Sequence, residues 1–447
     1  MAKNSSIEKA LMAASLMGAV FMAVIAGAAV VFFKIPPAGM MSGIIGSVIS
    51  SSSQEAPGKD AGDGGLWKEI RRSGAGVIRH DPSGAYQGYT LVTKAGLSGA
   101  LLLDMDGKAV HKWEVPFNKA FANTPHLAHV VEDRRIFWRK AWLYPDGSVL
   151  GVYEADVPML YGYGLVKADV NSNVLWSVKA RIHDDVQVDA QGRIYILGQR
   201  VGTRLPSSLL FIKKPFIDGY ILILSPEGKE IEGMSLMETI FNSAYLAEIN
   251  KLKVDHQFNG DFFHANSLWI APEGMKEKHG FLEEGHILVS FRNLGFLAVI
   301  NPKERKVVWL QHGFWLNPSS ARFTDSGTIT LFDGKGAFLE HGRSRALEYD
   351  PQTMNIVWQW SGDGEEALLS PEDGRLQTLP NGNFLVSEPD GGRLIEVTRG
   401  KKVVWEYVNP DRKGQGAGEK IAILTSGERY SKDQAPFLET LAPVAAP

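Results

Sequence analysis

One pattern of short apolar runs returns along the chain from about Gly88 to Pro410. Each copy starts with a turn of the type Pro/Asp-x-Gly and a run rich in Val, Ile, Leu, Phe and Tyr. A second run, an Asp- or Pro-centred turn and a strand that usually carries tryptophan follow. Short apolar runs bounded by Gly, Asp, Asn or Pro are typical of β-strands. The tryptophans of the pattern, which we expect to pack between repeats, are Trp113, Trp176, Trp309, Trp358, Trp360 and Trp405.

This repeat predicts an all-β fold, a six-bladed β-propeller. Six copies follow one another with a period of roughly 54 residues, against about 40–50 for a four-stranded blade, and visible insertions account for the surplus. Twisted sheets arranged radially leave only short, protected edges around a central channel. Five or seven blades remain alternatives.

Two segments depart from the repeat. Apolar residues at helical spacing predict an inserted helix of about 16 residues near 236–252, which either packs on the propeller or serves as a lid or docking element. The segment KIAILTSGERY (420–430) reads as a further strand that closes the ring against GYTLVT (88–93). We therefore expect the propeller at 66–430 and a C-terminal tail at 431–447.

The N-terminus reads as a membrane anchor. Leu11 to Phe33 holds no charged residue, and a helix of that length spans about 34 Å, enough for a hydrocarbon core of about 30 Å. The stretch exceeds a secretory h-region of about 7–15 residues, so residues 1–34 predict a cytoplasmic N-terminus and an uncleaved signal anchor; a cleaved signal is the alternative. Lysines before the stretch favour a single-pass protein of the inner (cytoplasmic) membrane with the propeller on the periplasmic side.

The next segment, 35–65, combines an apolar part with a flexible linker. Methionine and isoleucine recur on one side of residues 40–49, which predicts a short amphipathic helix; a loose apolar linker is the alternative. Small residues four apart in the anchor suit close approach of helices in lipid. Both features predict a membrane partner, either another subunit or a second copy of the chain.

Composition excludes several classes of protein. Apolar residues make up 44% and charged residues 22%, which excludes disorder as the main state. The net charge is −3 without a basic block, which argues against a nucleic-acid partner. The absence of cysteine excludes disulfides, thiolate metal sites and a cysteine nucleophile. Motifs for nucleotide binding or a serine hydrolase are also missing from the sequence.

Histidines recur just before the expected inner strands. His126 and His129 precede the second copy, His183 the third and His264 the fourth, and Arg292 follows in ILVSFRN. Inner strands of several blades converge on one channel, so this recurrence favours a shared site over isolated structural histidines. Imidazoles and carboxylates suit divalent ions, but spacings such as H-E-x-x-H do not occur, so we expect neither a metal nor another cofactor.

Several segments together resemble the bacterial arylsulfate sulfotransferases, which are six-bladed propellers of the periplasm. The segments are HANS (264–267), ILVSFRN (287–293), LFD (331–333), SRALEYD (344–350), LPNGNFLVSE (379–388) and RLIEVTRGKKVVWEYVNP (393–410). The resemblance spans roughly residues 88–430 and implies that a channel histidine carries a sulfuryl group from an aryl sulfate to a phenol. By motif, His183, His264 and Arg292 are the candidate catalytic residues. Asn266 and His129 are the candidate substrate-binding residues.

One departure from the family leaves two hypotheses open. The stretch that corresponds to the family's sulfohistidine segment is Pro318-Ser319-Ser320, without a histidine. In the first hypothesis His183 or His264 acts as the nucleophile, because a neutral imidazole is competent near neutral pH. A guanidinium with imidazole and amide donors would stabilise the sulfuryl oxygens. In the second, the propeller is catalytically inactive and serves as a structural or binding subunit of a membrane protein complex.

Overall fold

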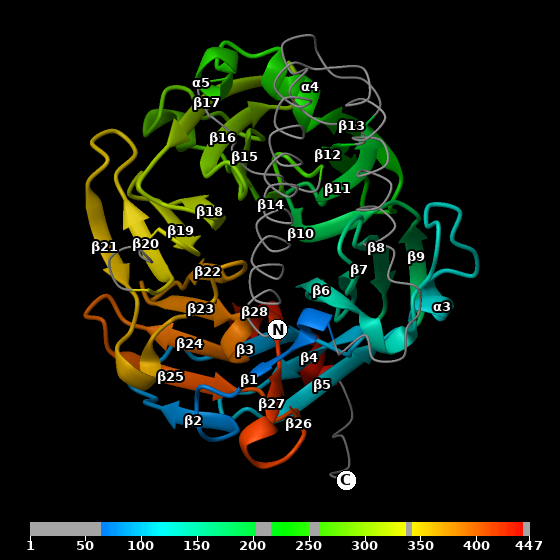
Figure 1. Cartoon of the computed structure of the whole chain (residues 1–447), viewed down its shortest axis with the longest axis vertical. Coiled ribbons are helices and arrows are strands. Elements are labelled where there is room, and N and C mark those ends of the chain that lie inside the picture. The colour runs from blue at the N-terminus through cyan, green and yellow to red at the C-terminus, as the bar shows by residue number, and fades with distance from the viewer. Residues whose placement is uncertain (1–63, 203–215, 251–259, 337–341, 441–447) are drawn as a thin grey trace, which may run out of the picture. The chain divides into compact units, whose positions relative to one another are not determined.

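The computed structural model describes residues 64–202, 216–250, 260–336 and 342–440 (Figure 1). The chain divides into two compact units, Met1–Gly62 and Asp63–Pro447. The predicted anchor at 1–34 and nearly all of the segment at 35–65 lie outside the described residues. Within the described ranges, no helix has the length and apolar character needed to cross a membrane.

The second unit is built from antiparallel sheets set around a common centre (Figure 1). Six of its seven sheets have four or five strands and the seventh has three. The first sheet is β28 (Leu424–Tyr430), β3 (Tyr89–Lys94), β4 (Gly99–Leu103) and β5 (Ala109–Glu114). The second is β6 (Ile136–Leu143), β7 (Val149–Ala155), β8 (Gly162–Ala168) and β9 (Val174–Val178). The third is β10 (Ile182–Val188), β11 (Ile194–Gly202), β12 (Phe216–Leu224) and β13 (Glu230–Ser235).

The remaining sheets continue the ring. The fourth is β14 (Ala265–Ile270), β15 (Ile287–Phe291), β16 (Phe296–Asn301) and β17 (Lys306–His312). The fifth is β18 (Pro318–Phe323), β19 (Ile329–Asp333), β20 (Arg345–Tyr349) and β21 (Ile356–Trp360). The sixth is β22 (Arg375–Thr378), β23 (Phe384–Glu388), β24 (Arg393–Val397) and β25 (Val403–Val408), to which β2 (Gly76–His80) adds a fifth strand. The small sheet is β1 (Trp67–Glu69), β27 (Lys420–Ala422) and β26 (Arg412–Lys413). The prediction of an all-β, propeller-like fold is confirmed.

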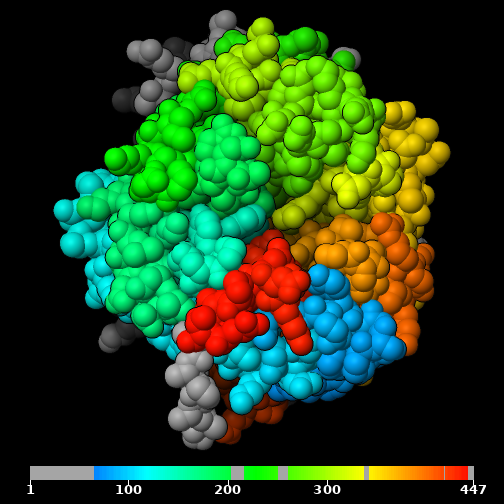
Figure 2. Space-filling model, turned by 180° about the vertical axis from the view of Figure 1, so that it is seen from behind, coloured from blue at the N-terminus to red at the C-terminus, as the bar shows by residue number. Residues whose placement is uncertain are grey.

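The ring closes between the two ends of the described chain. Strand β28 pairs antiparallel with β3, with Leu424 opposite Lys94 and Tyr430 opposite Tyr89, as the sequence predicted. Figure 2 shows the C-terminal segment in red beside the early strands in blue and cyan. Beyond the strand, η8 (Lys432–Gln434) and α7 (Phe437–Thr440) follow, and the Phe437 ring lies 6.0 Å from that of Trp113. The expected C-terminal tail is therefore ordered and packed as far as residue 440.

The tryptophans of the repeat join neighbouring sheets. The Trp113 indole nitrogen donates to the Gly147 carbonyl at 3.0 Å, in the turn between β6 and β7. Trp405 donates to Met105 O at 2.9 Å and Trp358 to Arg399 O at 2.9 Å. Each indole is thus buried while its N–H donates to a turn carbonyl of the neighbouring sheet, because a buried tryptophan N–H needs an acceptor.

The predicted insertion near 236–252 is two short helices, α4 (Leu236–Phe241) and α5 (Leu246–Asn250). Ser235 caps α4 by accepting a hydrogen bond from the Glu238 amide. The Ser243 hydroxyl donates to the Ile240 carbonyl at 2.6 Å, and a serine that binds the backbone in this way competes with helix continuation. The expectation of one continuous helix is therefore wrong. Other helical elements are η1 (Gly64–Leu66), α3 (Phe117–Ala120), η2 (Asp133–Arg135), η4 (Met275–Glu277), η5 (Gly364–Glu366), η6 (Pro389–Gly391) and η7 (Gly416–Gly418).

The inner strands carry β-bulges that shape the site. The register shifts at Arg139 in β6, between His183 and Val186 in β10, and between Ala265 and Ser267 in β14. A bulge places an extra residue opposite its partner strand and re-aims the side chain. β10 packs against both β6 and β14 at the centre (Figure 1), and the bulge residues Arg139 of β6 and Asp184 of β10 meet there.

Candidate active site

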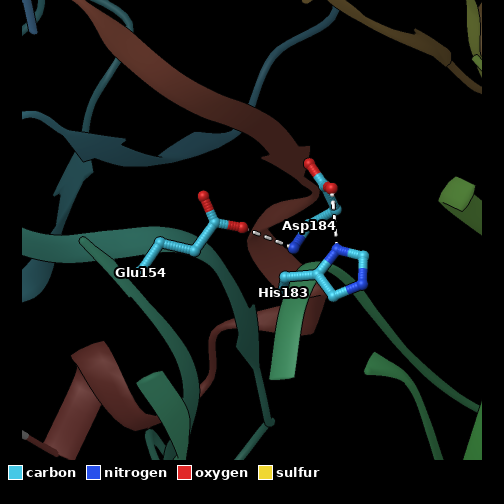
Figure 3. Close-up of side chains that lie close together, drawn as sticks. All are labelled: Glu154, His183 and Asp184. Atoms are coloured by element: carbon cyan, nitrogen blue, oxygen red, sulfur yellow. Dashed lines mark hydrogen bonds and ion pairs between the residues drawn. The ribbon is translucent and has the colours of Figure 1, made fainter. Parts of the chain in front are cut away.

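His183 forms a buried pair with the next residue. It is the second residue of β10, and its Nδ1 lies 2.8 Å from Asp184 Oδ2 (Figure 3). The Asp184 amide donates to Glu154 Oε1 at 2.6 Å, which anchors the bulge to β7. Burial alone would lower the pKa of His183, but the hydrogen bond and charge of Asp184 outweigh it and raise that pKa. The imidazole therefore donates its Nδ1 proton to a carboxylate.

His264 forms a second such pair just before β14. Asp261 accepts from His264 twice, at 2.7 Å from the Nδ1 atom and at 3.1 Å from the backbone amide. Burial would raise the pKa of Asp261, yet the charge and hydrogen bond of His264 outweigh it and lower that pKa. This clamp directs His264 Nε2 toward the Tyr161 hydroxyl, 3.4 Å away, and Asp184 Oδ2, 3.8 Å away.

Backbone strain marks both pairs. Asp184 has φ 55° and His264 has φ 47°, both in the left-handed region that residues with a Cβ seldom adopt. Ser320 repeats the feature in β18, with φ 53°. Such strain persists only where the surroundings enforce it, and it gathers at functional sites. Each of three successive inner strands thus has a left-handed residue at or just before its start, although only two of them carry a histidine there.

Arg292 follows β15 and lies against His264. Its backbone amide donates to the His264 carbonyl at 2.9 Å. Its side chain contacts Asn293 Oδ1 at 3.4 Å, Glu372 O at 3.2 Å and His264 Nδ1 at 3.5 Å, and its charge helps to lower the pKa of Asp261. Among the described residues no carboxylate forms a direct ion pair with Arg292, so its guanidinium can bind an anion.

A cavity of about 350 Å³ opens at these residues. It is lined by Pro158, Met159, Leu160, Tyr161, Gln199, Ile217, Asp261, His264, Arg292, Asn293, Asn317, Lys335 and Glu372. The Tyr161 ring contacts both imidazoles, with its centroid 5.4 Å from that of His183 and 6.0 Å from that of His264. His264 therefore faces the cavity directly, whereas His183 lies behind Tyr161.

The two predicted substrate-binding residues lie elsewhere. Asn266, buried in β14, donates from Nδ2 to Pro318 O at 3.1 Å, and its Oδ1 has no partner in the structure. His129 is exposed in the loop before β6 and is not among the residues that line the cavity. The structure therefore brings His183, His264 and Arg292 together, places Asn266 deeper in the centre and leaves His129 outside.

A buried arginine links the carboxylates of the site. Arg139 lies 3.2 Å from Asp184, 3.7 Å from Glu154 and 2.5 Å from Asp373. Burial and the charge of Asp184 raise the pKa of Glu154 to about 7. Possible ligand atoms of Glu154, His183 and Asp184 lie within 4.8 Å of one another, a spacing that a metal ion could use. Arg139 already supplies positive charge to both carboxylates and Asp184 engages His183, so this donor set fits an ion-pair network better than a metal.

The polar side chains at the start of β18 form structural hydrogen bonds and do not supply a catalytic base. The Ser319 hydroxyl, in the segment that lacks the family's histidine, donates to Gly374 O at 2.6 Å. Asn317 donates to Pro371 O at 3.0 Å. Both contacts tie β18 to the segment that leads into β22, so neither side chain replaces an imidazole.

Comparison with protein families decides the identity of this architecture. A model of the arylsulfotransferase (ASST) family matches residues 140–410. The chain belongs to the arylsulfotransferase family. The resemblance noted in the sequence is thereby confirmed. The match contains His183, His264, Asn266 and Arg292, and it begins after His129.

Other comparisons are more distant. The search of curated proteins gave no match. Among solved structures, a protein from Bacteroides caccae is 13% identical with a TM-score of 0.45, covering 72% of this arylsulfotransferase-family chain and 93% of its own. Virginiamycin B lyase from Staphylococcus aureus is 8% identical with a TM-score of 0.35, and the match covers 65% of this chain and 83% of the lyase. The Dos1 propeller is 9% identical with a TM-score of 0.39, covering 83% and 90%.

Proposed function

We propose that the cavity binds an aryl sulfate and that His264 carries its sulfuryl group to a phenolic acceptor. The observation that supports this most is the position of the Asp261–His264 pair beside Arg292 in the wall of the cavity. Arg292 suits the sulfate oxygens, and a guanidinium adjoining the reacting group would stabilise charge that develops on them. His264 takes the nucleophile's role rather than His183, because Tyr161 covers His183.

The reaction would proceed in two displacements. His264 Nε2 attacks sulfur, the bond from sulfur to the aryl oxygen breaks, and that oxygen leaves as a phenolate with the electron pair. Asp261 accepts the Nδ1 proton in a hydrogen bond and stabilises the charged ring. The acceptor's phenolic oxygen then attacks sulfur and the nitrogen–sulfur bond breaks. Its electron pair returns to Nε2, and the phenolic proton passes to the released phenolate or to water.

Tyr161 would assist the leaving oxygen. Burial and the neighbouring carboxylates raise the pKa of Tyr161 well above its usual value, so the hydroxyl stays protonated. In the structure it donates to Asp184 Oδ2 at 3.3 Å, and it would turn to the leaving oxygen when the substrate binds. It lies 3.4 Å from His264 Nε2, so it borders the space that the sulfuryl group would occupy.

A binding or structural subunit without turnover is the second candidate. The missing histidine before β19 favours it, as does Asp184 Oδ2 at 3.8 Å from His264 Nε2, because a carboxylate there competes with an anionic substrate. Function resides in the site rather than the fold, so family membership alone does not separate the two candidates.

Turnover separates them. Purified protein is incubated with a chromogenic aryl sulfate and excess phenol over about pH 6–9, the range in which imidazole changes charge. We expect transfer that His264→Ala abolishes and that His129→Ala, in an exposed loop outside the cavity, leaves intact. Folded native protein without turnover would favour the subunit candidate.

The remaining proposals concern architecture and location. We propose that the six sheets of four or five strands are the blades of a six-bladed propeller and that the three-stranded sheet is an accessory. The uncharged stretch at 11–33 supports a single-pass anchor in the inner membrane, with the propeller in the periplasm and a membrane subunit or second copy as partner. The anchor and the partner are tested by gentle detergent extraction followed by native mass measurement. The full chain is compared with a chain that begins at Gly64. Two monomers and no co-purifying protein would contradict the partner.

A further inference from the structure

The described chain begins at the end of the propeller where the cavity opens, which is also the end at which the inner strands begin. The Gly65 amide donates to Asp156 Oδ1 at 3.4 Å, and Asp156 lies close in sequence to Pro158, which lines the cavity. The Leu66 carbonyl accepts from the Ile423 amide at 3.0 Å, directly before β28. The segment that precedes the described residues therefore leaves the propeller beside the cavity.

This exit point is fixed by the fold. Leu66 is buried, and β1 pairs with β27 so that Trp67 lies opposite Ala422. Arg71 follows and lies 3.1 Å from Glu388 of β23. Any membrane anchor in the uncharged stretch at 11–33 is thus joined to the propeller at the cavity end.

Large apolar side chains are exposed at the same end. The described residues expose nine such side chains, and four of them lie in the outermost strands β9, β13 and β21. The other five lie in loops or strand ends at the cavity end, and none of the nine lies in the turns at the opposite end. Exposed apolar residues that gather on one face mark a surface for a membrane or a partner. The five are Val130 before β6, Met159 before β8, Val201 at the end of β11, Leu316 before β18 and Leu369 before β22.

The small sheet adds positive charge at this end. Lys413 of β26 lies opposite Lys420 of β27, and both residues are exposed. Like charges directly opposite one another destabilise a strand pair, and anionic lipid headgroups would offset that repulsion. The five apolar side chains come from separate loops of several sheets and do not form one groove. Scattered apolar residues with lysines beside them suit a lipid surface better than a protein partner.

We propose that the cavity end of the propeller lies on an anionic bilayer, and that the phenolic acceptor reaches the cavity from that bilayer as an amphiphile with an alkyl chain. This inference rests on the proposed function, because it assumes the anchor at 11–33 and transfer at His264. The apolar side chains enter the bilayer interface and the lysines meet the headgroups. Met159 is 41% exposed and also lines the cavity, so it joins the interface to the site.

Lipid contact is tested with single labels, because the chain has no cysteine of its own. Leu316→Cys lies at the cavity end, and Gln352→Cys lies in an exposed turn at the opposite end. Each full-length variant carries an environment-sensitive fluorophore and is reconstituted into phosphatidylcholine–phosphatidylglycerol vesicles that contain a nitroxide lipid. We expect the label at 316 to lose about half of its emission, because an interfacial group lies within about 5–10 Å of the headgroups, and the label at 352 to keep it.

The source of the acceptor is tested in the same vesicles by transfer from a soluble aryl sulfate to 4-dodecylphenol or to phenol. We expect native protein to use both acceptors. The double variant Val201→Asp/Leu316→Asp should lose about tenfold in transfer to dodecylphenol and keep transfer to phenol, because each added negative charge is repelled by the anionic surface. Ile356→Asp/Val357→Asp, at equally exposed apolar residues of β21, is the matched control and should keep both.

The outcomes separate this proposal from the proposed function. Equal quenching of the two labels overturns the docking face even where the protein is active. Transfer to phenol without transfer to dodecylphenol overturns the bilayer acceptor, as does a Val201→Asp/Leu316→Asp variant that uses both acceptors at the native rate. If neither acceptor is used, the proposed transfer fails, and the labels still decide whether this face meets lipid. If the full chain does not float with the vesicles, the anchor fails and the docking face is overturned with it.

Discussion

Replacement of Asp261 by asparagine tests the orientation of the proposed nucleophile. The carboxylate accepts from His264 Nδ1 at 2.7 Å and from the His264 amide at 3.1 Å. Asparagine has one acceptor atom, so it keeps one contact and turns an NH₂ group toward the other. The His264 backbone amide can only donate, so the asparagine oxygen stays with it and the NH₂ group faces Nδ1. Nδ1 must then accept, the ring proton moves to Nε2, and Nε2 no longer offers a lone pair to sulfur.

The size of the effect follows from that single bond. A hydrogen bond to a charged group contributes about 1.5–3 kcal/mol, which corresponds to about a 10- to 150-fold loss in the rate of sulfuryl transfer. The assay is initial transfer from a chromogenic aryl sulfate under saturating donor and acceptor. Asp325→Asn, at a fully exposed side chain, is the control. An Asp261→Asn rate within about twofold of native, in a series where His264→Ala is inactive, would refute the orienting role.

Three further predictions address neighbouring groups. Arg292→Ala should weaken binding of phenyl sulfate about 10- to 100-fold by calorimetry, with partial recovery in Arg292→Lys because ammonium lacks the bidentate fork; unchanged affinity would remove Arg292 from the anion site. Tyr161→Phe deletes the hydroxyl 3.4 Å from His264 Nε2 and should slow transfer about 5- to 30-fold, whereas a native rate would contradict its role toward the leaving oxygen. Glu154 has a pKa raised to about 7 in the fold, so the stability it contributes is present below about pH 4 and is lost as pH rises to 7. The unfolding temperature of Glu154→Gln should therefore fall less steeply between about pH 5 and pH 8 than that of the native protein. Identical slopes in the two proteins would contradict this assignment.

The strands of this protein are predictable because their signals are local. Each apolar run lies between turn residues, and the closing pair of β28 with β3 follows from one leftover strand at each end of the repeat. The helical insertion was misjudged because spacing alone does not reveal that the Ser243 hydroxyl binds the Ile240 carbonyl and ends the helix. Local pattern thus gives the type of an element more readily than its continuity.

The site is only half predictable for a related reason. His183 and His264 could be found because they recur at the starts of inner strands, and Arg292 because it sits in a recognisable segment. Tyr161 contacts His264 across 103 positions of sequence from a loop with no distinguishing motif. Asp261 likewise is recognised as part of the site only from its contacts with His264 in the structure. His129 was predicted to bind substrate because it precedes the second copy of the repeat; β6 begins only at Ile136, and the histidine lies in the exposed loop before it.

The central claim is that His264 bears the sulfuryl group, and peptide mass mapping tests it most directly. Native protein, His264→Ala and His129→Ala are each mixed with an aryl sulfate without acceptor, quenched at alkaline pH and digested. The account predicts a sulfonated peptide containing His264 in native protein and in His129→Ala, lost when phenol is added and absent from His264→Ala. A sulfonated His183 peptide, or turnover without any adduct at His264, would contradict it.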